Sequence, residues 1–287
     1  MKTNKKIILV IMLLLVVTTL SGCNTDHYQM PIGEGGGFGW VQWIVERVAD
    51  LIYIVSDLAG GYYVVGLIAI TLLIRILGWP IYSKSTALST NMQIAQPELE
   101  KLKQKYQGKN DPASQRAMQQ EMMQIYKEYG INPLGCVLPF LQMPIFIAMY
   151  QTVRRIPLTD RFTEDLNFNF LWFSFTDEPV TPWYSLQNAT FLVLALIVGV
   201  TMFGYQKYAM TKPEALQNKK YRTPQQEQSE KTMKYMMYFM TFMLVTIAFT
   251  SLGIAFYWII GNLFQFLQTY INRKQTLARL EAKKQRI

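Results

Sequence analysis

The apolar residues of this chain fall into five long blocks separated by polar segments. A transmembrane helix needs about 20 predominantly apolar residues, and five stretches meet that condition: residues 62–82, 134–153, 186–207, 233–251 and 253–271. The last two meet around Ser251 and Leu252, so we expect a tight helical hairpin there. The pattern predicts an all-α polytopic membrane protein with a five-helix core over residues 62–271.

A shorter apolar pattern precedes the first block. Across residues 40–58, Trp, Ile, Leu and Val recur at helical spacing, opposite the charged residues Glu46, Arg47, Asp50 and Asp57. This pattern is typical of an extracellular amphipathic helix that lies in the membrane interface. A helix packed over the membrane domain would give the same pattern, and both interpretations stay open.

The polar segment after the first block has a stripe of its own. Within residues 84–132, apolar residues follow heptad spacing on two arms, with a break at residues 108–112. Two such arms joined by a short turn predict an antiparallel helical hairpin. Pro97 is expected to kink or restart the first arm, because proline lacks the N–H of a helix interior.

The N-terminus has the layout of an export signal. Three lysines precede the apolar residues 7–20, and Leu20-Ser21-Gly22-Cys23 follows as a small-residue cleavage site. This run resembles a bacterial lipobox, which implies that residues 1–22 are a lipoprotein signal peptide and that Cys23 carries a lipid. Residues 23–39 then form a lipidated flexible tether. An ordinary secretory signal and a retained first span are the alternatives.

The distribution of lysine and arginine gives an orientation. Residues 83–133 contain seven, residues 207–234 contain seven, and residues 272–287 contain six, whereas residues 24–61 contain one and residues 154–185 three. The positive-inside rule therefore places the first three segments in the cytoplasm. An exported Cys23 followed by five crossings gives the same topology, with a basic cytoplasmic tail at 272–287.

Signals of enzymatic chemistry are missing from the sequence. Its one histidine, His27, lies in the tether, and no predicted span contains Asp or Glu. These facts exclude a histidine-based triad, a zinc pair of histidines and an intramembrane aspartyl protease. No phosphate-binding loop of the Gly-x-x-x-x-Gly-Lys type occurs. We therefore expect no enzyme, no metal and no cofactor.

One charged residue interrupts the first predicted span. Arg75 lies about two thirds of the way across it, where a charge costs about 2.5–3.5 kcal/mol on insertion scales. Its side chain could snorkel to the cytoplasmic end, roughly seven residues or about 10 Å away. The alternative is a hydrated groove, to which polar residues of other spans such as Gln142 and Asn262 would contribute. Five methionines of the fourth span are either client contacts or gap-filling residues: Met233, Met236, Met237, Met240 and Met243.

Three stretches resemble the YidC/Oxa/Alb family of membrane protein insertases. They are residues 121–133 running into 138–146, residues 253–268 with Phe256-Tyr257-Trp258, and residues 71–80 with their single arginine. The lipobox resembles that of the Gram-positive branch. The resemblance implies that Arg75 is the positive charge of a groove open to cytoplasm and lipid, and that the hairpin 84–132 is a mobile recruiting element. The residues assigned to this groove are Arg75, Thr71, Gln142, Tyr257, Trp258 and Asn262.

The function that follows is insertion and folding of client transmembrane segments in the bacterial cell membrane. The implied partners are nascent membrane proteins and lipids, with the Sec translocon and the ribosome as further candidates and DNA excluded. The basic tail could contact ribosomal RNA, although a solvated positive-inside tail explains it as well. A small anion transporter or channel is the rival interpretation, and a folding chaperone without insertion is a third.

Overall fold

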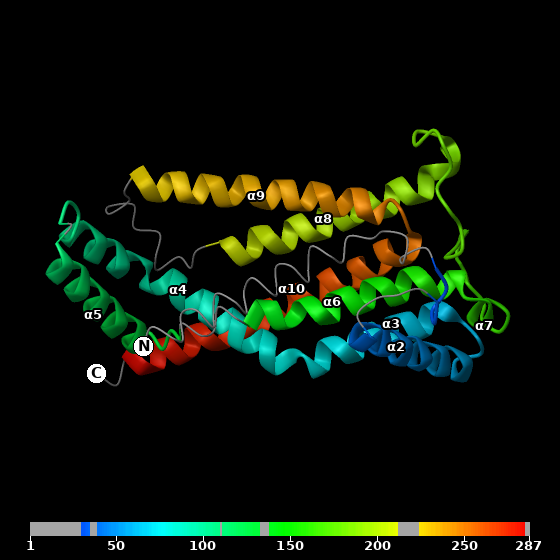
Figure 1. The fold of residues 1–287 in the computed structure, drawn as a ribbon, viewed down its shortest axis with the longest axis horizontal. Coiled ribbons are helices and arrows are strands. Elements are labelled where there is room, and N and C mark those ends of the chain that lie inside the picture. The colour runs from blue at the N-terminus through cyan, green and yellow to red at the C-terminus, as the bar shows by residue number, and fades with distance from the viewer. Residues whose placement is uncertain (1–29, 35–38, 110, 133–137, 212–223, 285–287) are drawn as a thin grey trace. The chain divides into compact units, whose positions relative to one another are not determined.

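The chain is built almost entirely of helices (Figure 1). The computed structural model describes residues 30–34, 39–109, 111–132, 138–211 and 224–284. Its helices are α2 (Gly39–Leu58), α3 (Tyr63–Leu77), α4 (Trp79–Lys105), α5 (Pro112–Glu128), α6 (Leu138–Arg155), η3 (Ile156–Leu158), α7 (Asp160–Thr163), η4 (Leu186–Asn188), α8 (Ala189–Met210), α9 (Pro224–Ala248) and α10 (Leu252–Lys284). The all-α class is confirmed. The signal peptide at 1–22, Cys23 and Cys136 lie outside the described residues.

The chain forms two compact units, each made of two stretches of sequence. The first comprises Met1–Leu67 and Pro144–Thr176, and the second comprises Ile68–Met143 and Asp177–Ile287. Two of the three unit boundaries therefore fall inside α3 and inside α6, and the third follows strand β2 (Phe173–Ser174).

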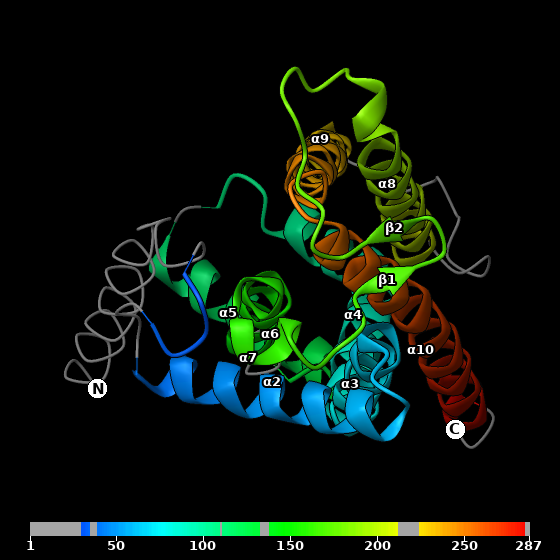
Figure 2. The ribbon, with the colours of Figure 1, turned by 90° about the vertical axis from the view of Figure 1, so that its right-hand side faces the viewer.

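In the first unit, α2 carries two apolar stripes rather than one. The stripe that is buried consists of Val41, Val45, Ala49, Ile52 and Ser56. It packs against Ala148 and Ile147 of α6, which Figure 2 shows nearly end-on with α2 running across the view below it. A second stripe is exposed and consists of Trp40, Trp43, Leu51, Ile54 and Leu58. One face of α2 thus meets protein, while the other presents large apolar side chains outward.

A close approach holds α2 against the start of α3. A Cβ atom added at Gly66 would lie 2.1 Å from Ser56 Oγ and 2.4 Å from the backbone oxygen of Ile52. Because a backbone atom cannot yield as a flexible side chain can, this contact needs glycine.

The loop that follows α7 in the first unit contains a small β-hairpin. Strands β1 (Asn169–Phe170) and β2 (Phe173–Ser174) pair antiparallel. Phe168 stacks on Tyr63 of α3 with ring centroids 4.6 Å apart. The sequence did not predict this hairpin, because strands of two residues are too short to show alternation.

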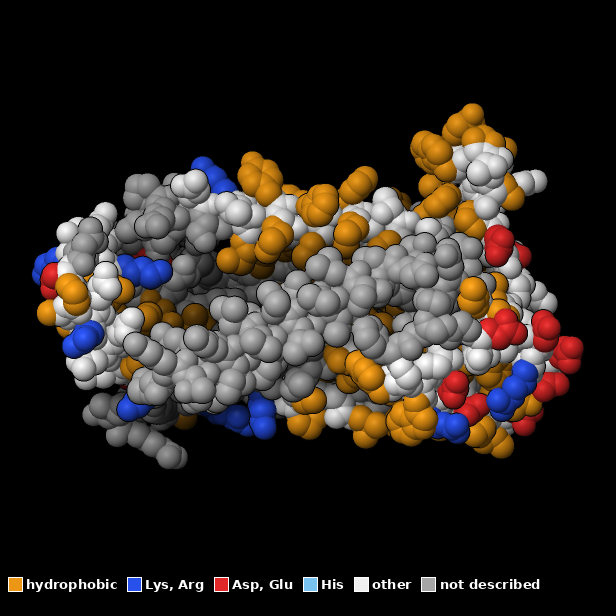
Figure 3. All heavy atoms as spheres, in the orientation of Figure 1, with side chains coloured by type: hydrophobic (Ala, Val, Ile, Leu, Met, Phe, Trp, Pro, Cys, Tyr) orange, Lys and Arg blue, Asp and Glu red, His pale blue; other side chains and the backbone are white. Residues whose placement is uncertain are grey.

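In the second unit, α8 and α9 run antiparallel side by side, and α10 packs against both α8 and α4 (Figure 1). Large apolar side chains of α9 are exposed along its outer edge, where Figure 3 shows a row of hydrophobic atoms. They include Met233, Met236, Phe239, Phe242 and Met243.

The expected continuous helix over residues 62–82 is wrong. Helix α3 ends at Leu77 and α4 begins at Trp79, with an angle of 58° between them. Gly78 precedes α4, and Pro80 occupies its first turn. Proline is favoured in a first turn but cannot continue a helix from before it, since its ring clashes with the carbonyl four residues earlier. The chain therefore turns at Gly78.

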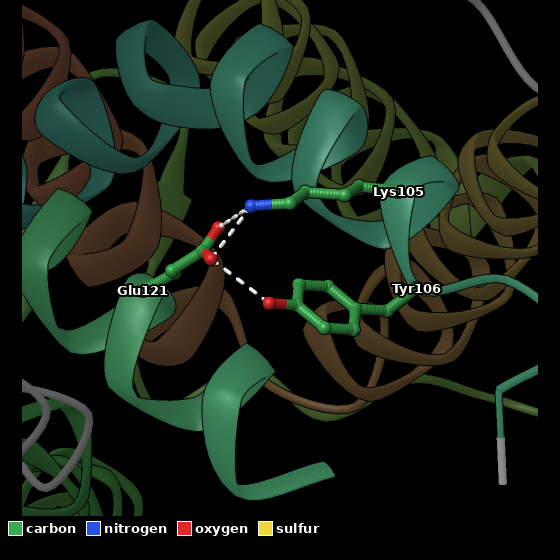
Figure 4. A network of polar contacts seen from close by, with 3 residues as sticks. All are labelled: Lys105, Tyr106 and Glu121. Carbon is green, nitrogen blue, oxygen red and sulfur yellow. Dashed lines mark hydrogen bonds and ion pairs between the residues drawn. The ribbon is translucent and has the colours of Figure 1, made fainter. Parts of the chain in front are cut away.

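Helices α4 and α5 pack against each other and are joined by a short turn. Near the turn, Lys105 Nζ donates to both carboxylate oxygens of Glu121 at 2.7 and 2.9 Å, and the Tyr106 hydroxyl donates to the same group at 2.8 Å (Figure 4). These bonds lower the pKa of Glu121, with the bond from Lys105 as the largest cause. Helix α4 is not restarted at Pro97, which lies inside it.

One described helical stretch, Leu186–Met210, is long and apolar enough to cross a membrane by itself. The bent pair α3 and α4 meets the same condition only when taken together. The other expected spans do not meet it among the described residues, so the count of five stays a prediction.

Candidate functional site: a polar cluster around Arg75

Arg75 lies in the last turn of α3 and is partly buried. The helix around it is apolar, so the guanidinium must find polar partners on other elements. It reaches two of them: Nη1 donates to Gln265 Oε1 of α10 at 3.0 Å and contacts the Tyr82 hydroxyl of α4 at 3.5 Å. The guanidinium carbon also lies 5.6 Å from the centre of the Tyr82 ring, within the range of a cation–π contact.

The contact with α10 depends on a missing side chain. A Cβ atom at Gly261 would lie 2.8 Å from Arg75 Nη2. Gly261 and Gln265 are one helical turn apart and therefore share a face of α10. On that face, Gly261 leaves room for the guanidinium, and Gln265 accepts a hydrogen bond from it.

The polar contacts continue to a fourth helix, α8. Gln265 Nε2 donates to the Tyr205 hydroxyl of α8 at 3.0 Å. Arg75, Tyr82, Gln265 and Tyr205, here called the Arg75 cluster, thus form one connected group drawn from four helices. None of the four is fully buried.

Further bonds hold the backbone around the cluster in place. Gln268 Nε2 donates to the backbone oxygen of Arg75 at 3.1 Å, and Trp79 Nε1 donates to Asn272 Oδ1 at 3.1 Å. Both partners lie on α10, and both amides are buried. The bend between α3 and α4 is therefore fastened to α10 on each side of Gly78.

The predicted site residues occupy three different settings. Asn262 donates to Thr201 Oγ1 of α8 at 3.3 Å, beside the cluster rather than within it. Thr71 is buried, and its hydroxyl has no hydrogen-bond partner among the described residues. Tyr257 and Trp258, expected to contact clients, are only 5% and 8% exposed. The side chain of Gln142 and the residue Cys23 lie outside the described part.

The residues that contact Arg75 were only partly found from sequence. Gln265 shows as a polar residue within an apolar block. Tyr82, and Tyr205 that Gln265 contacts in turn, carry no such signal, because tyrosine is frequent near the ends of membrane helices. The partner that the sequence did exclude is a carboxylate. Ion pairs such as Lys105–Glu121 and Arg161–Asp50 do occur in the described part of the chain, but Arg75 forms none there.

The cluster therefore offers a positive charge with neutral, polar neighbours. Amide and hydroxyl groups stabilise the guanidinium without neutralising it, so the charge remains available to an anionic group. No group of three or more His, Cys, Asp or Glu that could hold a metal occurs within the described ranges.

Comparisons with known proteins agree on one family. Residues 54–279 match the family model described as 60Kd inner membrane protein. The chain is 33% identical to membrane protein insertase MisCA of Bacillus subtilis (strain 168), over 94% of this chain and 92% of the relative. It is 33% identical to membrane protein insertase YidC 2 of Bacillus anthracis over 93% of each. To membrane protein insertase YidC of Oceanobacillus iheyensis it is 31% identical, over 96% of this chain and 99% of the relative.

Proposed function

The chain belongs to the family of bacterial membrane protein insertases, and we propose that its insertase activity depends on the Arg75 cluster. The observation that carries this proposal is a partly buried guanidinium held by Gln265 and Tyr82, in a part of the chain whose predicted spans contain no carboxylate. A structural arginine in a membrane is normally paired. An arginine held only by neutral groups keeps its charge for a transient ligand.

The mechanism is thermodynamic rather than catalytic. A client helix carries a short acidic or polar extracellular segment that must cross hydrocarbon. A hydrated groove open to cytoplasm and lipid shortens the low-dielectric path, and Arg75 attracts the segment. A carboxylate about 4 Å from a cation gains about 4 kcal/mol at an effective dielectric constant of 20. That gain is comparable to the cost of placing one charge in a membrane helix.

Release of the client follows from the apolar character of its helix. Once the polar segment has passed, the client's apolar face is better solvated by lipid than by a groove lined with Gln, Asn and Tyr. The client therefore leaves sideways. Thr71, Gln142, Tyr257, Trp258 and Asn262 are proposed to line this groove, and no nucleotide is needed.

The remaining parts of the proposal concern the setting of the groove. Five spans cross the membrane, with Cys23 lipidated outside and residues 272–287 in the cytoplasm. The hairpin 84–132 recruits clients, and the Sec translocon and the ribosome are candidate partners. Residues 40–58 lie at the outer interface.

The charge at position 75 can be tested with a series of substitutions in cells depleted of other insertases. Arg75→Lys should retain much of the activity, because the charge is kept although the guanidinium fork is lost. Arg75→Ala should impair clients with acidic extracellular segments more than matched clients with neutral ones, and Arg75→Glu should be worse still. Arg47→Ala, which removes an exposed arginine of α2, is the control. Equal insertion of acidic and neutral clients by Arg75→Ala would show that the charge only snorkels.

Water access to the same position is a second readout. In a chain whose Cys136 has been replaced, Arg75→Cys should react with a membrane-impermeant thiol reagent added from the cytoplasmic side and not from outside. Reaction from both sides would favour the transporter interpretation instead.

A further inference from the structure

Arg155, at the end of α6 in the first unit, is almost completely buried at 1% exposure. Its Nε donates to the backbone oxygen of Met30 at 2.9 Å, and its Nη2 donates to those of Pro31 and Glu34 at 2.7 and 2.8 Å. Nη1 donates to Gln42 Oε1 at 2.8 Å and to Gln151 Oε1 at 3.4 Å. A guanidinium has five N–H donors, and Arg155 makes five hydrogen bonds.

Three of these acceptors belong to one short segment near the N-terminus. Residues 30–34, here called the strap, also make a fourth bond to the unit: the Ile32 N–H donates to Thr159 Oγ1 at 2.9 Å. The sequence predicts these residues to be part of a flexible tether, because glycines follow them. In the structure, Arg155 at the end of α6 and Thr159 just after it instead hold the strap in place. Sequence could not show this, since the acceptors are backbone carbonyls.

The geometry fits a clamp better than a binding site for an outside ligand. Every donor of the guanidinium is used within the unit, and no described carboxylate forms an ion pair with it. Burial lowers the pKa of Arg155, and the charge of Glu46 opposes that effect. Arginine nevertheless stays protonated in proteins. Three of the five carbonyl groups that stabilise this buried charge thus belong to the strap.

We propose that Arg155 is a positioning residue that clamps the strap and so limits how far the lipid anchor on Cys23 can move from the first unit. The reach follows from chain length. Met30 lies seven positions after Cys23, and an extended chain spans at most about 3.5 Å per residue. The lipidated residue therefore stays within roughly 25 Å of Met30, which Arg155 holds. A tether free up to residue 39 would reach about 30 Å farther, since it would add nine residues. This limit on the lipid anchor, here called the leash, rests on the proposed lipidation of Cys23. The binding of the strap by Arg155, here called the clamp, does not.

Proteolysis after Glu34 tests the clamp directly. The purified full-length protein in nanodiscs would be treated with an endoproteinase specific for glutamate. The Glu34 side chain is exposed, but cleavage needs the strap to leave Arg155 and Thr159. Arg155→Gln and the nearly isosteric Thr159→Val should each raise the rate of cleavage after Glu34 about tenfold or more, because each removes hydrogen bonds that hold the strap closed. Arg47→Gln, which removes another arginine of the unit, should leave the rate unchanged.

Cleavage after Glu164, at the end of α7, reports general unfolding of the same unit. A rise at Glu34 that exceeds any rise at Glu164 supports the clamp. If Arg155→Gln raises the rates of cleavage after Glu34 and after Glu164 equally, it has destabilised the whole unit. The Thr159→Val variant then decides whether the clamp exists. Unchanged cleavage after Glu34 in Thr159→Val, or fast cleavage in the unsubstituted protein, overturns the clamp.

The mass of the released fragment separates this inference from the proposed function. A fragment that begins at lipidated Cys23 supports the leash. A fragment without lipid overturns the leash and the lipidation of Cys23, while the rate of its release still decides whether the clamp exists.

Discussion

Arg75 and Arg155 are two arginines near the ends of apolar helices, and neither forms an ion pair among the described residues. They differ in how completely their donors are used. Arg155 is buried and makes five hydrogen bonds, three of them to backbone carbonyls. Arg75 is partly buried and makes two, to the side chains of Gln265 and Tyr82, with no further hydrogen bond from its guanidinium among the described residues.

This difference separates a structural charge from one that stays available. Backbone carbonyls that meet at one guanidinium fix the chain that carries them, because each would lose a partner if the arginine left. Side-chain amides and hydroxyls can rotate to other partners or to water. Burial of the charge alone would not separate the two roles, whereas the kind of acceptor does.

The strongest test of this comparison is thermal stability. Arg155→Met should destabilise the protein by at least about 3 kcal/mol, because five hydrogen bonds of a buried guanidinium are lost, three of them to backbone carbonyls. For a chain of this size that corresponds to a fall in the midpoint of about 6 °C or more. Arg75→Met should change stability by less than about 1 kcal/mol, since removal of an incompletely paired charge from an apolar setting is often neutral. Unfolding of both variants in nanodiscs, followed by fluorescence, measures the two shifts. Equal losses would mean that Arg75 is structural as well.

A smaller effect should follow from filling the space beside Arg75. Gly261→Ala places a methyl group 2.8 Å from the present position of Nη2. The guanidinium lies at the end of a flexible side chain and can move, so the bond to Gln265 should break at little cost in stability. We expect acidic clients to be inserted several-fold more slowly. Gly204→Ala, on α8 with nothing within 4 Å, is the matched control. If both alanine variants insert acidic clients at the unsubstituted rate, the present position of the guanidinium is unimportant.

The smallest expected effect concerns an exposed cation, Lys105 at the end of α4. Its partner Glu121 has a lowered pKa, so the pair contributes stability above the unfolded carboxyl pKa of about 4.3. That contribution is lost as the pH falls through the lower folded pKa. Backbone amide hydrogen exchange can measure this loss once its rates are corrected for their intrinsic pH dependence. The amides of α4 and α5 should be less protected at about pH 3 than at pH 7. Glu121→Gln should remove most of this difference, and a difference that persists in that variant would have to come from other carboxyl groups.

The sequence predicted the class and the family of the fold because both depend on long apolar blocks and a few specific motifs. It failed at Gly78, where the apolar run continues through a change of helix direction. Composition alone cannot show such a bend, although Pro80 marks where a new helix begins. The two stripes of α2 were merged into one for a related reason: an exposed apolar residue facing lipid and a buried one facing protein look alike in sequence.

The sequence identified the charged residue of the site but not most of the residues around it. Arg75 stands out because an arginine within an apolar block is rare. Tyr82 and Tyr205 do not stand out, and Gly261 is recognisable only when the opposing helix is known. Arg155 was counted as one of three basic residues in an outer loop. Its importance depends on contacts with carbonyls more than 120 positions away, which no local pattern records.

That separation along the chain has a consequence for the order in which the protein itself is made. The strap and α2 leave the ribosome well before α6, since the bond from Arg155 to Glu34 spans 121 positions. At about 5–20 residues per second, roughly 6–24 s of synthesis separate the two. During that interval the strap lacks Arg155, and α2 lacks the α6 surface that covers Val45. The apolar stripe that contains Val45 therefore lacks its protein partner until α6 has been made. Helix α2, although it is the first of the described helices to be made, can thus reach its final packing only after α6.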